Sequence, residues 1–390
     1  MYVAVKGGEK AIAAAHALLH EERRGPAFIP EIGLDQIGHQ LKLAVDRVMA
    51  EASLYCPRLA ALAIKQAAGD LQEAIFLLRA YRTTLPRFAA SLPLETDCMR
   101  QERRISATWK DLPGGQVLGS TFDYTHRLLD RSLEKTAPTL AKEDTRDNED
   151  IAAFEGSIPH PARTPRAAHA LEQEGLLERS WSSIRKEEDA RKLSQIPDIT
   201  RDPLELPCDR PQDRPLRLQM LARADEGFLL GMAYSTQRGF GAVHPFTSEL
   251  RRGYVECTII PEELDFPLVI GEIEVTECVT ISRYTGTALE PCFTQGYGLV
   301  FGNNERKSLS MSIVDRALRA KEMEEEETGP AQNPEFVLMH GDNVDASGFV
   351  QHIKLPHYVD FQAELSLIRE LRKNRSRKSE DEAQTSGEQA

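Results

Sequence analysis

The hydrophobic pattern of the chain changes twice, and these changes constrain its fold more than any other feature of the sequence. Up to about residue 130, apolar residues recur with the spacing of amphipathic helices. From about 131 to 200, charged residues mix with prolines and apolar periodicity is poor. From 201 onward, helical and strand-like stretches alternate without a regular βαβ repeat. The predicted fold class is therefore α+β, with a mostly helical N-terminal part and a mixed α/β C-terminal part.

The same changes divide the 390 residues into four segments. This length is sufficient for two domains of ordinary size. We expect a helical N-terminal domain at 1–130, a variable and partly flexible segment at 131–200, an α+β domain with the candidate site at 201–375, and a flexible tail at 376–390.

Individual elements follow from local periodicity and from helix start signals. A stripe from Leu34 to Val48 predicts one buried helix face, and Asp70 with Glu73 resembles a capping box that begins another helix. That helix is expected to turn Ala74, Leu77, Leu78 and Tyr81 inward. We also expect helices at 225–235, 304–319 and 361–372, and strands at 3–5, 254–260, 268–281, 296–301, 336–339 and 348–354.

Composition excludes several classes of protein. A net charge of −13 argues against nonspecific nucleic-acid binding, which requires a basic surface. No apolar run approaches the roughly 20 residues of a membrane helix, and the N-terminus lacks the regions of a secretory signal. The six cysteines are scattered without a C-x-x-C pair, so disulfides are not expected. We expect a cytoplasmic protein that binds neither nucleic acid nor membrane.

One candidate anion site lies where a predicted strand ends in Gly302 and a predicted helix begins near Asn304. Free backbone N–H groups at a helix start bind anions, and glycine permits close approach. Arg306 and Lys307 in the first helical turn oppose the helix dipole, a cost that a bound phosphate would offset. The alternative is an ordinary strand–turn–helix connection.

A second candidate is the segment from Ala233 to Gly241, in which two glycines flank Phe240. Its aromatic ring could stack on a base, and Arg238 could pair with a phosphate. The alternative is a helix that simply ends at glycine. Arg79 and Arg82, three residues apart on one predicted helix, are further candidates for phosphate contact.

Two histidines and two glutamates complete the candidates. His352 and His357 flank Pro356, so their rings could converge on a transition metal, while Asp360 could join them or cap the last helix. Glu272 and Glu274 share one face of a predicted strand, as paired acid–base carboxylates do. The alternatives are structural histidines and a solvated sheet face.

Several longer motifs resemble one known family, the I subunit of the carbon–phosphorus lyase core complex. The similarity covers about 1–130 and 200–372 and is weakest at 131–200. The matching motifs are Val3 to Ile12, Glu73 to Leu85, Asp123 to Asp130, Ala233 to Gly241, Phe293 to Gly302 and His352 to Phe361.

This resemblance implies a specific reaction. In that family a phosphonate oxygen displaces adenine from C1′ of ATP, giving α-D-ribose 1-methylphosphonate 5-triphosphate, and the isolated subunit acts as a purine nucleosidase. The resemblance also implies assembly with the G, H and J subunits, a requirement for the L protein, and a zinc site carried by His352 and His357.

The implied chemistry assigns provisional roles to the candidates. An oxocarbenium-like state needs nearby negative charge, and the leaving purine needs an acid; the carboxylate candidates are Glu272, Glu274, Asp342 and Asp360. The triphosphate, with Mg²⁺, needs a basic clamp; the candidates are Arg79, Arg82, Arg238, Arg306 and Lys307. Two other possibilities are a non-catalytic scaffold with an interface metal site and a self-sufficient nucleoside hydrolase.

Overall fold

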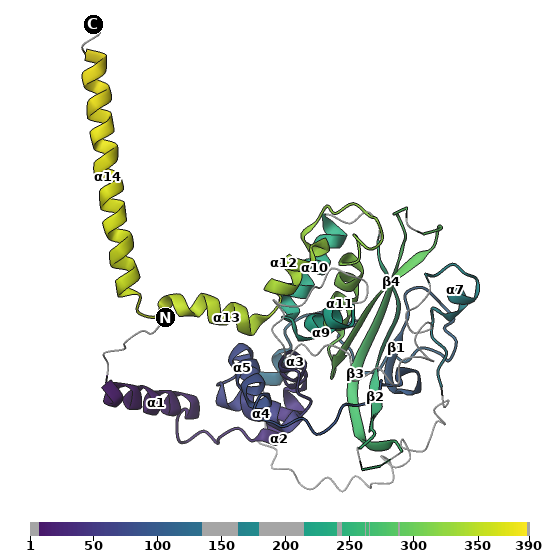
Figure 1. The fold of residues 1–390 in the computed structure, drawn as a ribbon. Coiled ribbons are helices and arrows are strands. Elements are labelled where there is room, and N and C mark those ends of the chain that lie inside the picture. The colour runs from purple at the N-terminus through teal and green to yellow at the C-terminus, as the bar shows by residue number, and fades with distance from the viewer. Residues whose placement is uncertain are drawn as a thin grey trace. The chain divides into compact units, whose positions relative to one another are not determined.

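Four antiparallel strands form the sheet at the centre of the larger unit (Figure 1). Their spatial order follows the sequence, β1-β2-β3-β4, and each strand pairs with the next. At the outer edge of β4, Leu176 and Glu178 exchange backbone hydrogen bonds with Phe293, which covers the first residue of that edge. The strands are β1 (Arg100–Ile105), β2 (Phe246–Ile259), β3 (Leu268–Arg283) and β4 (Phe293–Phe301).

This computed structural model describes residues 8–134, 163–178, 214–239, 244–261, 263–264, 266–287 and 289–387. The fold class is α+β, as predicted. The chain forms two units, one of residues 32–343 and one of residues 1–31 with 344–390. The four-segment division remains a prediction, and the predicted strand at 3–5 lies outside the described residues.

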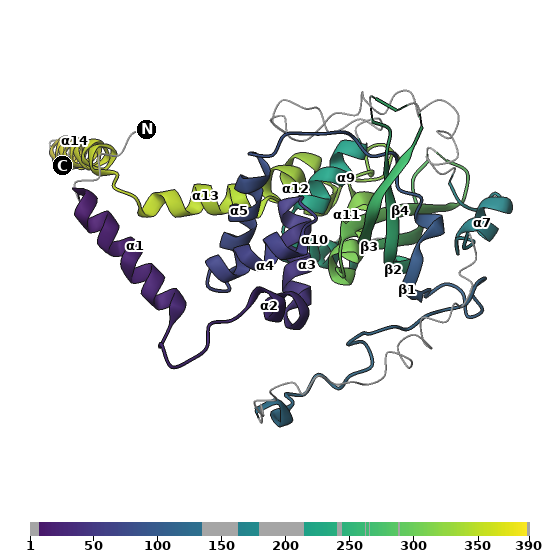
Figure 2. The ribbon, with the colours of Figure 1, turned by 90° about the horizontal axis from the view of Figure 1, so that it is seen from below.

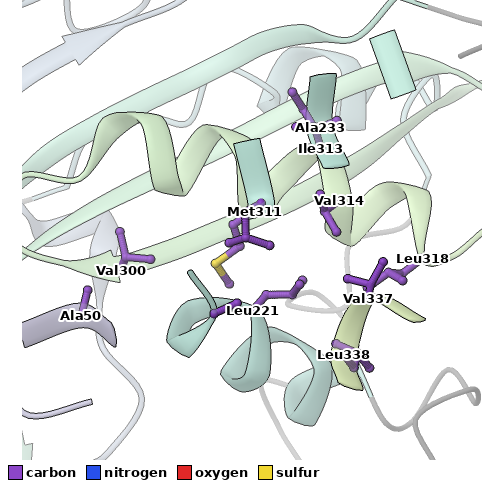
Figure 3. Close-up of a cluster of buried hydrophobic side chains, with 12 residues drawn as sticks. Ala50, Leu221, Ala233, Val300, Met311, Ile313, Val314, Leu318, Val337 and Leu338 are labelled. Atoms are coloured by element: carbon purple, nitrogen blue, oxygen red, sulfur yellow. The ribbon is translucent and has the colours of Figure 1, made fainter. Parts of the chain in front are cut away.

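Three helices cover one face of the sheet, as both ribbon views show (Figures 1 and 2). They are α9 (Arg214–Arg223), α10 (Glu226–Arg238) and α11 (Glu305–Ala317). Their apolar side chains form the main hydrophobic cluster, in which Leu221 and Met311 meet Val300 of β4 (Figure 3). Burial of this apolar surface holds the helical layer against the sheet.

Glycines bring α11 unusually close to β4. A Cβ atom at Gly296 would lie 1.8 Å from the carbonyl oxygen of Ser312, and one at Gly298 would lie 2.1 Å from that of Ser308. Both serines are buried. The strand and the helix therefore pack backbone against backbone, which only glycine on the strand permits.

Four short helices make up the N-terminal part of the larger unit, and their ends carry recognisable caps. Asp70 accepts hydrogen bonds from two backbone N–H groups at the start of α5, as its cap position predicts. Pro57 occupies the first turn of α4. The helices are α2 (Leu34–Gln40), α3 (Lys42–Ala52), α4 (Pro57–Gln66) and α5 (Leu71–Arg82).

The smaller unit consists of α1 (Gly8–Arg24), most of α13 (Asn343–Gln351) and α14 (Tyr358–Gly387). α1 has no buried residue, and apolar side chains such as Phe349, Tyr358 and Val359 are exposed.

No described helix is long and apolar enough to cross a membrane. Except for Cys208, which lies outside the described residues, the cysteines are free, as expected.

Several predictions of local structure are wrong. Residues 336–339 belong to a helix, α12 (Pro334–His340), because Asn333 caps its start and Pro334 suits a first turn. Residues 348–354 lie in α13 and a short 3₁₀ helix, η7 (His352–Lys354). The stripe from Leu34 to Val48 is interrupted at exposed Leu41, and Tyr81 is exposed. A four-residue apolar run cannot distinguish a strand from a helix.

The contact between α11 and β4 yields a first prediction. Gly298→Ala should lower the free energy of unfolding by about 1–3 kcal/mol or more, because the new methyl group collides with backbone that cannot move aside easily. Gly38→Ala is the control, since its Cβ would meet nothing within 4 Å. Urea unfolding monitored by circular dichroism measures both variants. Equal stability of the two would contradict the close packing.

Candidate functional site

The carboxylate of Glu51, on α3, joins four segments that are distant in the sequence. It is fully buried and accepts hydrogen bonds from Arg47, from the backbone N–H of Glu226 and from the side-chain amide of Asn343. The ammonium of Lys307 lies 3.6 Å from the same group. A buried carboxylate is stable only when its charge and lone pairs are satisfied in this way.

A second group of charges forms around Asp342, beside the C-terminal end of α5. Nη1 of Arg79 lies 2.6 Å from both oxygens of Asp342, and Nε of Arg223 lies 3.0 Å from one of them. Arg79 also donates to the backbone carbonyl of Glu51. Two of the predicted site residues, Arg79 and Asp342, are therefore partners of each other.

The two basic residues at the start of α11 have different surroundings. Lys307 is fully buried and donates to the carbonyl oxygen of Ala224 at 2.6 Å. Burial lowers the pKa of Lys307 to about 8, although Glu51 and Glu226 oppose that shift. Arg306 pairs with Glu226, and its side chain is 72% exposed. Only Arg306 is placed to reach a ligand without local rearrangement.

The turn between β4 and α11 is already bound by groups of the protein. Gly302 has a φ of +69°, and a Cβ there would collide with the carboxylate of Asp46. Asp46 accepts from the backbone N–H of Asn303, and Thr276 accepts from that of Asn304. Two of the backbone N–H groups at this turn, those of Asn303 and Asn304, are therefore bound by an aspartate and a threonine.

The same turn brings Glu274 into a buried cluster of charges. Lys42 contacts both Asp46 and Glu274, at 2.7 and 2.6 Å, and Arg252 donates to Glu274 at 3.1 Å. Burial raises the pKa of Asp46, although Lys42 and the N–H of Asn303 partly oppose that shift. A carboxyl group with a raised pKa is suited to general-acid chemistry. Sequence analysis missed Asp46, because no pattern marked it.

The other predicted residues lie apart from these clusters. Glu272 pairs with Arg100 at the surface, so it does not share the buried environment of Glu274. Arg238 is exposed in the last turn of α10, and the loop predicted after it lies mostly outside the described residues. Asp360 is exposed in the first turn of α14.

In the smaller unit, the two candidate metal ligands lie side by side. The rings of His352 and His357 have their centroids 5.3 Å apart, so Pro356 permits the convergence that was expected. His352 does not lie on the strand predicted at 348–354, because residues 352–354 form a 3₁₀ helix.

Hydrogen bonds orient both imidazole rings. Nδ1 of His352 contacts the carbonyl oxygen of Phe349, and Nδ1 of His357 lies 2.7 Å from that of Leu355. Because a carbonyl oxygen only accepts, each Nδ1 carries the proton and each Nε2 keeps a lone pair for a metal. The described residues contain no group of three or more metal-binding side chains, so further ligands would have to come from elsewhere.

The sheet face opposite α11 holds a buried polar cluster that sequence analysis missed. Glu277 accepts from Arg251, from the hydroxyl of Thr96 and from the phenol of Tyr297. Burial alone would raise the pKa of Glu277, but Arg251 and Arg166 lower it to about 2. The sequence alternation that predicted Glu272 and Glu274 could also have indicated that Glu277 lies on the other face.

Comparison with known proteins identifies the family. The family model for bacterial phosphonate metabolism protein (PhnI) matches residues 1–375. The α-D-ribose 1-methylphosphonate 5-triphosphate synthase subunit PhnI of Rhizobium meliloti (strain 1021) is 53% identical over 391 residues, covering 99% of this chain and 98% of the relative. This chain belongs to the PhnI family. The PhnI subunit of Escherichia coli (strain K12) is also 53% identical, over 96% of this chain and 99% of the relative.

Membership of the PhnI family confirms the resemblance that the motifs indicated. The family match includes residues 131–200, where the motif similarity was weakest, and all eleven candidate site residues. Both relatives are named as the PhnI subunit of α-D-ribose 1-methylphosphonate 5-triphosphate synthase. The roles of individual residues remain predictions.

Glu51 provides a stability prediction for this PhnI family member. Glu51→Gln should cost about 3–5 kcal/mol, because it removes the carboxylate beside the fully buried Lys307. Glu95→Gln removes an exposed partner of Arg163 and should change stability by less than about 1 kcal/mol. Denaturant unfolding compares the two variants. Similar losses of unfolding free energy in Glu51→Gln and Glu95→Gln would show that Glu51 does not organise the core.

The lowered pKa of Glu277 predicts that the stability of the folded protein depends on pH. Its pKa of about 2 in the folded protein lies below the ordinary value of 4.5, so its contribution is complete above pH 4.5 and is lost as the pH falls toward 2. Glu277→Gln should therefore lose stability at pH 7 and show a shallower decline between pH 4.5 and 2. Unfolding curves at several pH values test this, and parallel declines in both proteins would rule it out.

Proposed function

We propose that this chain is the subunit that displaces adenine from ATP with a phosphonate, giving α-D-ribose 1-phosphonate 5-triphosphate, within a carbon–phosphorus lyase core complex. Alone, the subunit uses water as the nucleophile and acts as a purine nucleosidase. The observation that carries this proposal is the 53% identity to two synthase subunits over nearly the full length of each chain. We propose a cytoplasmic location for the complex.

The proposed reaction breaks the bond between C1′ and N9 and forms one between C1′ and a phosphonate oxygen. Adenine leaves with a proton, so an acid is needed near the purine, and carboxylates are needed near the electron-poor ribose. Asp46 and Glu274 on the larger unit suit these needs, since both are buried and close to one lysine. Glu272 and Asp360 remain the other proposed carboxylates, whereas Asp342 is bound by Arg79 and Arg223.

The proposed clamp for the Mg²⁺–ATP phosphates includes Arg79, Arg82, Arg238, Arg306 and Lys307. Guanidinium groups suit this task because they bind phosphate through paired N–H donors. The excess of arginine around Asp342 and the exposure of Arg306 support a clamp on the larger unit.

We further propose that the subunit assembles with the G, H and J subunits, with the L protein needed for the full reaction. A zinc ion would be held by Nε2 of His352 and of His357, with remaining ligands from water, a carboxylate or the J subunit. Bound zinc would supply Lewis-acid chemistry. The exposed apolar residues around both histidines, including Phe349, Ile353 and Val359, fit an interface.

That exposed surface also favours a second candidate, a scaffold subunit whose metal site serves only an interface. The two proposals differ in what the purified chain does with ATP. If the purified chain alone releases adenine from ATP, the proposal of a purely non-catalytic scaffold is excluded. Full activity without partners, unaffected by phosphonate, would instead indicate a self-sufficient nucleoside hydrolase.

The deciding experiment incubates ATP with the purified chain, with and without the partner subunits and methylphosphonate, and separates the products by HPLC. We expect slow release of adenine and ribose 5-triphosphate from the chain alone. With the partners and methylphosphonate, we expect the phosphonate adduct. Release of phosphate without adenine would refute glycosidic cleavage.

The zinc site is tested separately by metal content. His352→Ala and His357→Ala should each lower the zinc bound by the assembled complex and reduce phosphonate-dependent product. His20→Ala, on exposed α1, is the control and should do neither. Elemental analysis of the purified complexes gives the answer. Unchanged zinc in both variants would leave these histidines with a structural role.

A further inference from the structure

We propose that Arg82 and Arg223 bind the phosphate chain of the nucleoside triphosphate, and that Asp342 positions Arg223 for this task. The inference rests on the proposed function and deepens it by locating the triphosphate at the C-terminal ends of α5 and α9. It also changes the role of Asp342 from a catalytic carboxylate to a positioning residue.

The geometry starts from the shared carboxylate of Asp342. Arg79 binds both of its oxygens, while Arg223 binds one of them through Nε alone. Within the described part of the chain, the two Nη atoms of Arg223 have no hydrogen-bond partner. A guanidinium held by Nε presents its other two nitrogens as the paired donors that phosphate oxygens accept.

Arg82 lies one turn beyond Arg79 on α5 and is half-buried. Among the residues that the structure describes, no hydrogen bond or ion pair involves its side chain. Burial lowers the pKa of Arg82, and the nearby charges of Arg223 and Arg87 lower it further. Because Arg82 follows Arg79 by one turn on α5, and Arg79 shares Asp342 with Arg223, the guanidinium of Arg82 lies on the side of α5 where Arg223 binds. Asp342 is already bound to two arginines, so it does not neutralise Arg82 as well.

An ordinary structural role explains each arginine alone but not their arrangement. Arg82 and Arg223 occupy the last turns of their helices, where positive charge interacts favourably with the helix dipole. That interaction does not require two helix ends to bring their arginines together. A polyanion between them would offset the repulsion and satisfy the N–H donors that the protein leaves unused.

The proposal is tested with inorganic triphosphate as the probe, because it lacks the base and the sugar. Isothermal titration calorimetry on the purified full chain should show binding that Arg82→Gln weakens about tenfold or more, as expected when one charge-assisted pair is lost. Arg82→Lys should retain part of the affinity. Arg58→Gln, at an exposed arginine of α4, is the control and should bind as the wild type does.

Because Arg82 bonds to no other described side chain and is repelled by neighbouring arginines, Arg82→Gln should not lower the melting temperature. Asp342→Asn tests the positioning role through steady-state kinetics with ATP. We expect a raised KM with kcat nearly unchanged, whereas loss of a catalytic carboxylate would lower kcat. A large fall in kcat at unchanged KM would overturn the new role of Asp342.

The outcomes separate this site from the proposed function. If Arg82→Gln binds triphosphate as tightly as the wild type, or if the wild type does not bind it, the site is refuted even when adenine is released from ATP. If the wild type binds triphosphate through Arg82 but releases no adenine, the site stands and the proposed reaction fails.

Discussion

The buried carboxylate of Glu51 is the interaction on which the larger unit depends. It joins α3 to the start of α10, to Lys307 of α11 and to Asn343, and its own backbone carbonyl holds Arg79 of α5. A charge in this position is costly unless every partner is present, so it defines one arrangement of these helices. The helices that carry the candidate residues are therefore placed by an electrostatic contact as well as by apolar packing.

Small residues complete this arrangement at the sheet. Gly296 and Gly298 let α11 approach β4 until backbone meets backbone, and Gly302 turns the chain so that Asp46 can bind the start of α11. A side chain at Gly296 or Gly298 would push α11 away from the sheet, and one at Gly302 would collide with the carboxylate of Asp46. In this packing of α11, Lys307 faces the buried Glu51, whereas the side chain of Arg306 is exposed.

Charge is distributed unevenly around α3, and under the proposed function this distribution suits the two ends of a nucleotide. Acidic side chains with one lysine gather at the β4–α11 turn, whereas arginines gather around Asp342. A nucleotide undergoing glycosidic cleavage needs both environments, negative near the ribose and positive near the phosphates. Both lie within the larger unit, while the histidine pair belongs to the smaller one.

The sequence by itself determined the fold class, the cap at Asp70, the strands β3 and β4, and the second half of β2. These features depend on local periodicity and on side chains that bond their own backbone. Its motifs also identified the family. Tertiary structure alone decided the burial of Lys307, the pairing of Arg79 with Asp342 and the burial of Asp46 beside Glu274. These features depend on partners tens to hundreds of residues away, and no local pattern records which distant charge will neutralise a buried one.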